Sequence, residues 1–104
     1  MRSRPAFHAQ GTHVLSDLHG ADPTLLADVA LLERTATQAA ELAGARVLGV
    51  HCHHFGLGQG VAGVVLLAES HLTFHTWPEH GFAALDAFMC GECRPQVAID
   101  WLSK

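Results

Sequence analysis

The sequence lacks a long apolar run, an excess of positive charge and an even number of cysteines, and each absence excludes a class of protein. No apolar stretch reaches the ~20 residues that a helix needs to span a bilayer, so we expect no membrane segment. The net charge of −4 argues against nucleic acid or an anionic membrane as the main partner. Three cysteines do not suggest a disulfide framework, and we expect a cytoplasmic protein with free thiols.

The N-terminal residues also lack the features of a secretory signal. Two arginines lie within Met1 to Pro5, but no apolar core follows them. Residues 1–10 are therefore expected to form a loose arm. Of the 104 residues, 49% are hydrophobic, which is enough to bury one core, so the sequence predicts a single domain over residues 1–104.

Two segments have the pattern of helices. Asp22 followed by Pro23 is typical of a helix start, because the aspartate caps free N–H groups and proline suits the first helical position. Apolar residues then recur every three or four positions until Gly44, which predicts one continuous helix. That apolar stripe comprises Leu25, Val29, Leu32, Ala36, Ala39 and Ala43. Pro95 is expected to begin a short second helix. Its expected inward residues are Val97, Ala98, Trp101 and Leu102.

Five segments have the pattern of strands, and a glycine-rich hairpin loop is expected at 56–60. The third segment is apolar almost throughout, which predicts burial on both faces, whereas the fourth and fifth alternate between apolar and polar residues. The expected strands are 11–18, 46–55, 61–69, 71–77 and 82–90. This order predicts an α+β fold, a two-layer sandwich in which an antiparallel sheet is covered on one face by two helices.

Histidines and cysteines suggest two alternatives for a site. His51 to His54, with Cys90 and Cys93, offer zinc ligands, but neighbouring strand residues point to opposite faces and converge poorly. Cys90 and Cys93 also have the spacing of a redox pair. Such pairs usually open a helix after a βα unit, whereas this one follows a late strand.

A third alternative is hydrolysis. Ser70 and His75 have the residue types of a nucleophile and its base. The surrounding sequence has no Gly-x-Ser-x-Gly elbow, however. Taken singly, Ser70, His75 and Cys90 are each the kind of residue that a core contains without any function.

Taken together, these residues resemble a known family. The run from Gly63 to Glu79, which reads GVVLLAESHLTFHTWPE, closely resembles the bacterial-type S-adenosylmethionine decarboxylase proenzymes. The run from Gly81 to Gly91 continues the similarity. Weaker similarity extends to His13–Leu18 and to the region after Pro95, so the resemblance covers nearly the whole chain.

The resemblance implies a zymogen that makes its own cofactor. By analogy, autocatalytic serinolysis at Glu69–Ser70 separates a β chain (1–69) from an α chain (70–104), and Ser70 becomes a pyruvoyl group. That group forms a Schiff base with the substrate, so neither PLP nor a metal is expected. His75 matches the family's proton acceptor in processing, and we expect its strand to lie beside the cleaved turn. Cys90 matches the proton donor in decarboxylation.

The resemblance also implies a substrate and an assembly. Glu79 matches a substrate-binding position, and Trp77 and Phe55 are aromatic residues expected near it. The implied activity is that of a carboxy-lyase that converts S-adenosylmethionine into the aminopropyl donor for polyamine (spermidine) synthesis. The expected partners are a small amino-acid-type substrate and a second processed protomer in a homodimer, with no nucleic acid and no membrane.

Three departures from the family pattern leave other functions open. Ala62 stands where the family often has a hydroxyl that assists processing. The segment from Phe55 to Val61 is one residue longer than usual and lacks proline, and Ala21 replaces a frequent cysteine. The alternatives are the same pyruvoyl chemistry on L-ornithine or L-arginine, and an unprocessed homologue that acts as a binding or regulatory subunit.

Overall fold

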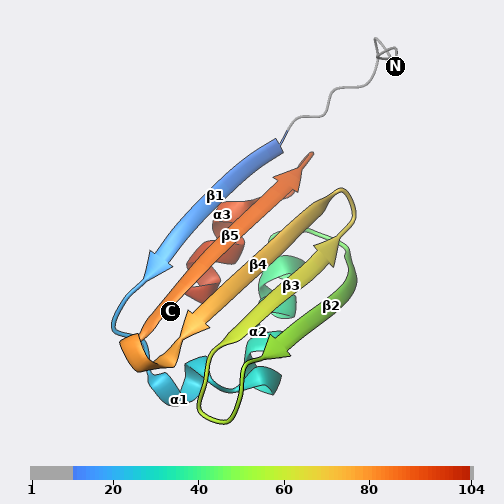
Figure 1. Ribbon diagram of the computed structural model, residues 1–104. Helices are drawn as coiled ribbons and strands as arrows, with labels where there is room; N and C mark the ends of the chain where they lie inside the picture. Colours follow the sequence, from blue (N-terminus) through green and yellow to red (C-terminus); the bar gives the residue numbers. More distant parts are fainter. Residues whose placement is uncertain (1–10, 104) are drawn as a thin grey trace, which may run out of the picture.

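The computed structural model describes residues 11–103, so the expected arm at 1–10 lies outside the described residues. Five strands form one antiparallel sheet in the order β1-β5-β4-β3-β2 (Figure 1). The elements are β1 (Gly11–Leu18), α1 (Pro23–Leu26), α2 (Val29–Leu42), β2 (Val47–His54), β3 (Val61–Leu67), β4 (Ser70–Trp77), the 3₁₀ helix η1 (Pro78–His80), β5 (Phe82–Cys90) and α3 (Pro95–Leu102).

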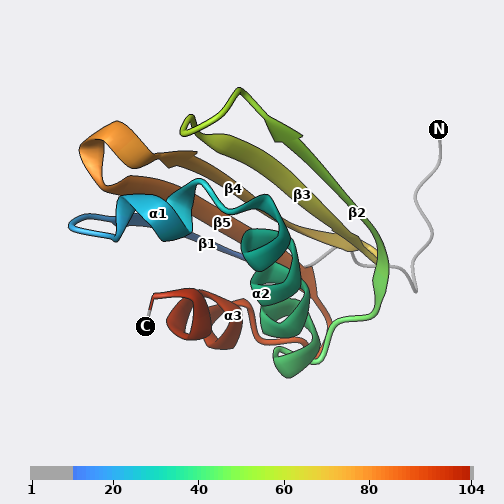
Figure 2. The ribbon, with the colours of Figure 1, turned by 90° about the horizontal axis from the view of Figure 1, so that it is seen from below.

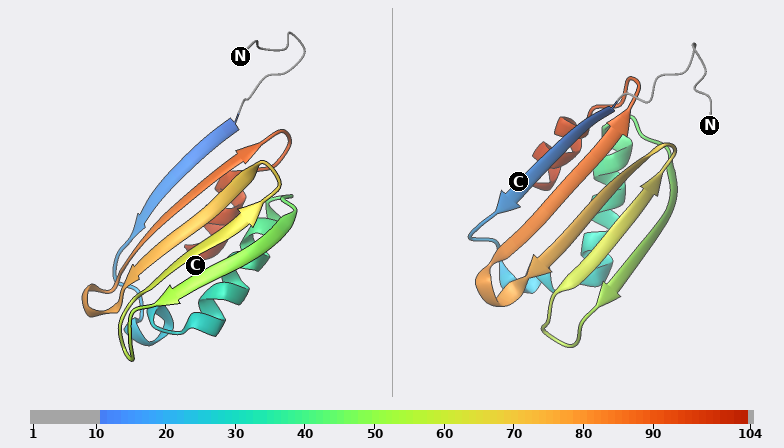
Figure 3. Two further views of the ribbon diagram at one scale, coloured as in Figure 1. Left: turned by 45° about the vertical axis from the view of Figure 1, so that its right-hand side comes forward. Right: turned by 45° about the horizontal axis from the view of Figure 1, so that its top comes forward.

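The helices all lie on one face of the sheet, as Figure 2 shows from below and Figure 3 from two further sides. The core fills the space between the two layers. Helix α2 contributes small residues to it, the buried Ala36, Ala39 and Ala40, which lets the helix approach the sheet closely. The sheet contributes the larger Leu72 and Met89. The predicted two-layer α+β fold is therefore confirmed.

The expected single helix from Pro23 to Gly44 is wrong, because the chain breaks after one turn. Asp22 caps α1 as predicted, accepting a hydrogen bond from the Thr24 N–H at 2.9 Å. Asp28 then caps a second helix, α2, by accepting from the Leu31 N–H at 3.1 Å. The break rotates the apolar stripe, so that Leu26 is buried and Leu25 is half exposed. Gly44 ends α2 with a left-handed φ of 92°, as expected.

The prediction that β3 is buried on both faces is also wrong. Val61 and Val65 face the helices and are buried, whereas Val64 and Leu66 point the other way and are 42% and 54% exposed. The reason is that helices cover only one face of this sheet. The alternation predicted for β4 and β5 is confirmed, with every second residue buried.

Helix α3 differs from expectation at one position. It buries Ala98 as predicted, with Val97 and Leu102 partly buried against the core. Trp101, expected to face inward, is 37% exposed, and Ile99 is buried instead. The helix begins at the buried Pro95, which lies with Ala98 and Ile99 on its buried face.

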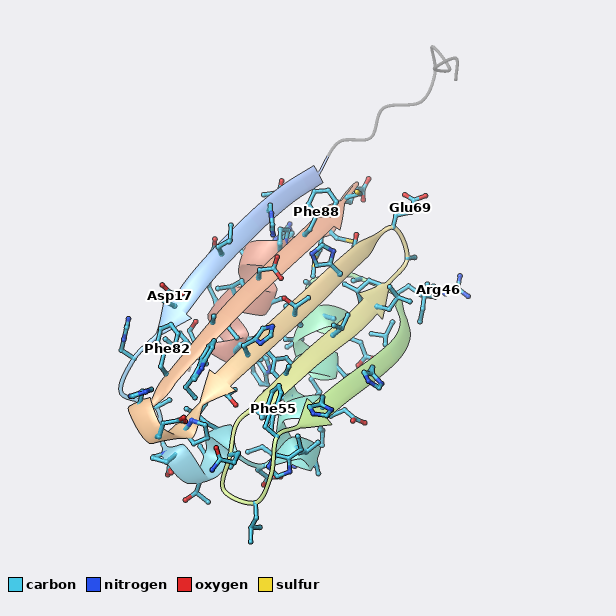
Figure 4. The ribbon with its side chains drawn as sticks, in the orientation of Figure 1. Asp17, Arg46, Phe55, Glu69, Phe82 and Phe88 are labelled. Atoms are coloured by element: carbon cyan, nitrogen blue, oxygen red, sulfur yellow. The ribbon has the colours of Figure 1, made fainter. Side chains whose placement is uncertain are left out.

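The sheet face opposite the helices, called the open face below, is turned toward the viewer in Figures 1 and 4. It carries a mixture of apolar, histidine and acidic side chains. They include His13, Leu15, His51, His53, Val64, Leu66, His71, Thr73, His75, Trp77, Asp86 and Phe88. Within residues 11–103, no helix combines the length and apolar character that crossing a membrane requires.

Candidate active site

The expected cleavage peptide lies at the tip of the β3–β4 hairpin. Leu67 pairs with Ser70, which leaves Ala68 and Glu69 as a two-residue loop, and Figure 4 labels Glu69 at this tip. Glu69 has a φ of 60° and is the only non-glycine residue with positive φ in the described part of the chain. This conformation costs an L-residue about 1–2 kcal/mol. The peptide bond that the family resemblance marks for cleavage therefore follows a strained residue.

Cys90 contacts both sides of that peptide bond from the neighbouring strand. Its backbone N–H donates a hydrogen bond to Ser70 Oγ at 3.2 Å. Its thiol donates to the carbonyl oxygen of Glu69 at 3.3 Å. The first contact holds the hydroxyl, and the second polarises the carbonyl that the hydroxyl would attack. The structure thus brings together three of the residues singled out in the sequence.

His75 does not join this group within one chain. Ser70 and His75 are both in β4, and an extended strand rises about 3.3 Å per residue, which separates them by about 17 Å. The strand of His75 adjoins the cleaved turn, as expected, but it begins at Ser70 and runs away from it, so within a single chain His75 does not lie beside the turn. His75 stacks on Trp77, with ring centroids 6.0 Å apart.

The expected substrate-binding residues meet at the His75 end of the sheet. Phe55, Trp77 and Glu79 line a cavity of about 290 Å³ together with His75. Phe55 and Trp77 are 61% and 38% exposed, so their faces are available to a ligand. A larger cavity of about 410 Å³ lies between the helices and the sheet and is lined by none of these four residues.

Two buried contacts that the sequence did not reveal hold the loop at 56–60 beside the smaller cavity. The Thr76 hydroxyl accepts a hydrogen bond from the Val61 N–H at 2.9 Å and donates to the Leu26 carbonyl at 2.7 Å. Gly60 lies so close to β4 that a Cβ atom there would be 2.0 Å from the Thr76 carbonyl oxygen. A lone inward threonine and a loop glycine carry no distinctive sequence signal, so only the packing reveals them.

The departures from the family pattern lie at the same end of the sheet. Ala62 is directly opposite His75 in the β3–β4 register, so the missing hydroxyl would stand beside that imidazole. Ala21 donates its N–H to the Gly81 carbonyl at 2.9 Å, next to η1. Both substitutions therefore concern the surroundings of His75 and the cavity, and neither touches Ser70 or Cys90.

The zinc and redox alternatives are not assembled. His54 pairs with Val61 at the cavity end of the sheet, whereas Cys90 lies at the hairpin end. Cys52 is partly buried against the core, and burial followed by the charge of Glu33 raises the pKa of its thiol. The Cys93 thiol donates a hydrogen bond to the Gly44 carbonyl at 3.3 Å, whereas the Cys90 thiol donates to the Glu69 carbonyl. The two thiols therefore bond to different parts of the chain.

A cluster of His13, His71 and Asp86 on the open face was also missed. The residues come from β1, β4 and β5 and share no short motif. Burial raises the pKa of the Asp86 carboxyl, but hydrogen bonds from Thr73 and His13 and the charges of His71 and His13 outweigh it. The pKa of Asp86 consequently lies below its usual value.

Comparisons with known proteins identify the family of the chain. Residues 12–104 match the family model described as S-adenosylmethionine decarboxylase. The chain is 49% identical over 98 residues to the S-adenosylmethionine decarboxylase proenzyme of Caldanaerobacter subterraneus, covering 93% of this chain and 78% of that protein. It is 44% identical over 96 residues to the proenzyme of the same name from Thermodesulfovibrio yellowstonii, covering 91% and 70%.

A solved structure gives the same answer for the fold. The crystal structure of the adenosylmethionine decarboxylase from Aquifex aeolicus superimposes with a TM-score of 0.79 at 35% identity, covering 88% of this chain and 76% of that one. The family model spans most of the described residues, and the sequence relatives are aligned along most of their length. The chain therefore belongs to the S-adenosylmethionine decarboxylase family.

Proposed function

We propose that this chain is a self-cleaving proenzyme whose processed form decarboxylates S-adenosylmethionine with a pyruvoyl group made from Ser70. The observation that carries the proposal is the pair of hydrogen bonds from Cys90 to Ser70 and to the carbonyl of Glu69. The names of the relatives support the substrate. The product is the aminopropyl donor for polyamine synthesis. The three free cysteines are consistent with a reducing, cytoplasmic location.

The first stage is cleavage of the chain. The Ser70 oxygen attacks the Glu69 carbonyl carbon, and the bond from that carbon to the Ser70 nitrogen breaks to give an ester. A base removes the Ser70 α-proton, and the bond between Ser70 Cβ and the ester oxygen breaks, which leaves dehydroalanine at position 70 and releases residues 1–69 with a new carboxylate. Water hydrolyses the resulting dehydroalanine, ammonia leaves, and residues 71–104 carry the pyruvoyl cap. Strain at Glu69 and the Cys90 thiol both favour the attack.

The second stage is decarboxylation. When formed, the pyruvoyl group supplies a carbonyl that takes up the substrate amine and the electron pair left by CO2. The surroundings of Ser70 fit such a group, because the Cys90 N–H donates to the Ser70 oxygen and the Cys90 thiol donates to the adjoining Glu69 carbonyl. In this proposal the Cys90 thiol returns a proton to the substrate α-carbon, which its contact beside Ser70 supports. Phe55 and Trp77 offer faces for the adenine or the sulfonium, and Glu79 offers a carboxylate. This chemistry requires neither PLP nor a metal.

We infer a homodimer from the positions of the two groups of residues. Ser70 and Cys90 lie at one end of the sheet, while His75, Trp77 and Glu79 lie at the other. A second copy packed against the open face about a twofold axis would bring the cavity end of one chain over the hairpin end of its partner. The exposed Val64 and Leu66 give that face apolar area to bury. We therefore propose that His75 removes the Ser70 α-proton of the partner chain.

The first test is the intact mass of the purified protein under denaturing conditions. We expect two fragments split between Glu69 and Ser70, the second blocked at its N-terminus and reactive with a carbonyl reagent. A single species at 11.1 kDa would instead support the unprocessed homologue. Release of labelled CO2 from S-adenosylmethionine, ornithine and arginine then identifies the substrate. Release from ornithine or arginine alone would contradict the proposed substrate and leave the pyruvoyl chemistry standing.

A further inference from the structure

Two imidazoles and a carboxylate converge on the open face, apart from the residues used above. Nε2 of His13 and Nε2 of His71 both approach the same atom, Oδ2 of Asp86. The His71 distance is 3.5 Å, and one potential ligand atom from each of the three residues lies within 4.8 Å of the others. In a tetrahedral zinc site with bonds of about 2.0–2.2 Å, ligand atoms are about 3.4 Å apart. Small side-chain rotations therefore suffice to place all three around one ion.

The three side chains come from rigid, adjacent strands. His13 and His71 both lie opposite Phe88 in the register of β1, β5 and β4, and Asp86 is the next residue on that face of β5. The Phe88 ring packs against both imidazoles, with each ring centroid 5.9 Å away, and the two imidazole centroids are 6.0 Å from each other. Three neighbouring strands, of which β1 is the edge strand, thus hold the donors in place, as a preformed metal site requires.

The carboxylate also has the outer contact that metal ligands usually have. The Thr73 hydroxyl donates a hydrogen bond to Oδ1 of Asp86, which leaves Oδ2 toward the histidines. The His13, Asp86 and His71 side chains are 44%, 21% and 40% exposed in a single chain, so an ion can reach them before two chains pack together, and in the dimer proposed above it lies between the two sheets. Two imidazoles and one carboxylate suit zinc, cobalt or nickel, whereas magnesium and calcium prefer oxygen ligands alone.

We propose that His13, His71 and Asp86 bind one divalent transition-metal ion of the zinc type on each chain. The two Nε2 atoms and Oδ2 of Asp86 supply three ligands, and water completes the coordination. The ion links β1 to β4 across β5, next to Ser70 in the sequence because His71 follows it. It takes no part in the decarboxylation described above, so the proposal does not depend on that function.

The test is metal binding by the Ser70→Ala full-length chain, which keeps cleavage out of the measurement. Chelator-treated protein is titrated with Co²⁺ and followed by its visible absorption, and Zn²⁺ is then added in competition. We expect one ion per chain, displaced by Zn²⁺. Replacing a residue that only supports a ligand typically costs 10–100-fold in affinity, so we expect Thr73→Val to lose about tenfold and His71→Ala to lose more than about 100-fold.

Matched variants separate this site from other histidines. His53, in β2, is also exposed on the open face but lies outside the cluster. His53→Ala should therefore leave the stoichiometry and affinity of metal binding unchanged. Nuclear magnetic resonance of the unsubstituted cluster in the Ser70→Ala chain gives a second readout, with Zn²⁺ shifting the ring signals of His13 and His71 first. The proposal is overturned if those signals do not move, or if His53→Ala abolishes binding while His71→Ala does not.

Discussion

The thiol of Cys90 donates a hydrogen bond to the carbonyl oxygen of Glu69 across 21 positions of sequence, at 3.3 Å. The same residue holds the Ser70 hydroxyl through its backbone N–H. The end of β5 lies beside the turn in which β4 begins. Cys90 therefore lies next to the Glu69–Ser70 peptide bond and next to the position of the proposed pyruvoyl group. Cys90 can therefore act in two stages, and variants can separate them.

Ser70→Ala should remain a single chain. It lacks the hydroxyl that attacks Glu69, so neither the ester nor the pyruvoyl group can form. The intact mass should stay near that of the full chain, 11.1 kDa, and no decarboxylation should be detectable. Ser16→Ala, in β1, is the matched control and should be cut like the unsubstituted protein. Two fragments from Ser70→Ala would contradict the proposed cleavage scheme.

Cys90→Ala should affect cleavage and decarboxylation unequally. Cleavage loses one hydrogen bond, worth about 1 kcal/mol, and should slow about fivefold while still occurring. Decarboxylation loses its general acid and should fall at least about 100-fold in kcat. The rate of fragment formation and the release of CO2 by the cut fraction measure the two separately. Cys93→Ala removes the neighbouring thiol as a control, and normal turnover by Cys90→Ala would remove Cys90 from the proton-donor role.

Glu69→Gly should slow cleavage by relieving strain. Glycine adopts the φ of 60° without steric cost, so the uncut chain should gain about 1 kcal/mol, which corresponds to about fivefold slower cleavage. Denaturant unfolding in the Ser70→Ala background measures the stability, and intact mass against time measures the rate. Glu69→Ala keeps the strain while removing the carboxylate. If both variants slow cleavage equally, the carboxylate matters and the strain does not.

The fold could be predicted from the sequence where the pattern of a single strand decides which of its faces is buried. The alternation from His71 to Trp77 and from Phe82 to Cys90 gave the buried face of each strand correctly. The capping aspartate at Asp28 was not recognised, because it lies inside an otherwise continuous apolar periodicity. The apolar run in β3 could not reveal that helices cover only one face.

The site could be predicted only in part, because the sequence pattern of one strand does not show which strands are paired. A long, specific motif predicts Ser70, His75 and Cys90 as site residues, but their mutual positions depend on strand pairing. Cys90 reaches Ser70 because β4 and β5 are neighbours, which no local pattern states. His75 lies far along β4 because Ser70 begins that same strand. The cluster of His13, His71 and Asp86 requires three strands at once and left no signal in the sequence.

The stability of the folded chain should depend on pH through Asp86. Hydrogen bonds and the neighbouring histidines hold its pKa below the usual value despite partial burial. A depressed pKa means that the ionised carboxylate stabilises the fold above the unfolded-state pKa of about 3.9, and that this contribution disappears as pH falls through the lower folded-state pKa. In the metal-free Ser70→Ala background, Asp86→Asn should therefore be less stable than its parent at pH 6 and similar to it near pH 2. Denaturant titrations across that range measure the difference, and a constant difference would contradict the assignment.

Mixed dimers should show whether His75 acts on the partner chain. Ser70→Ala and His75→Ala chains, carrying different affinity tags, are co-expressed and purified through both tags. Each variant alone should remain uncut. In the proposed arrangement Ser70 of one chain faces the intact His75 of the other, so in the mixed dimer the His75→Ala chain should be cut and the Ser70→Ala chain should not. The separation of about 17 Å between Ser70 and His75 within one chain is the reason for this expectation.

The matched control pairs the His75→Ala chain with a chain that carries both substitutions. That dimer contains a Ser70 but no His75, so it should stay whole, and intact mass distinguishes the chains by their tags. Cleavage of His75→Ala on its own would show that another group removes the α-proton. If the mixed dimer stays uncut although both chains are folded and associated, His75 does not serve the partner's Ser70. Cleavage confined to the mixed dimer is the outcome that requires two chains to build one site, because only there does a complete pair of residues exist.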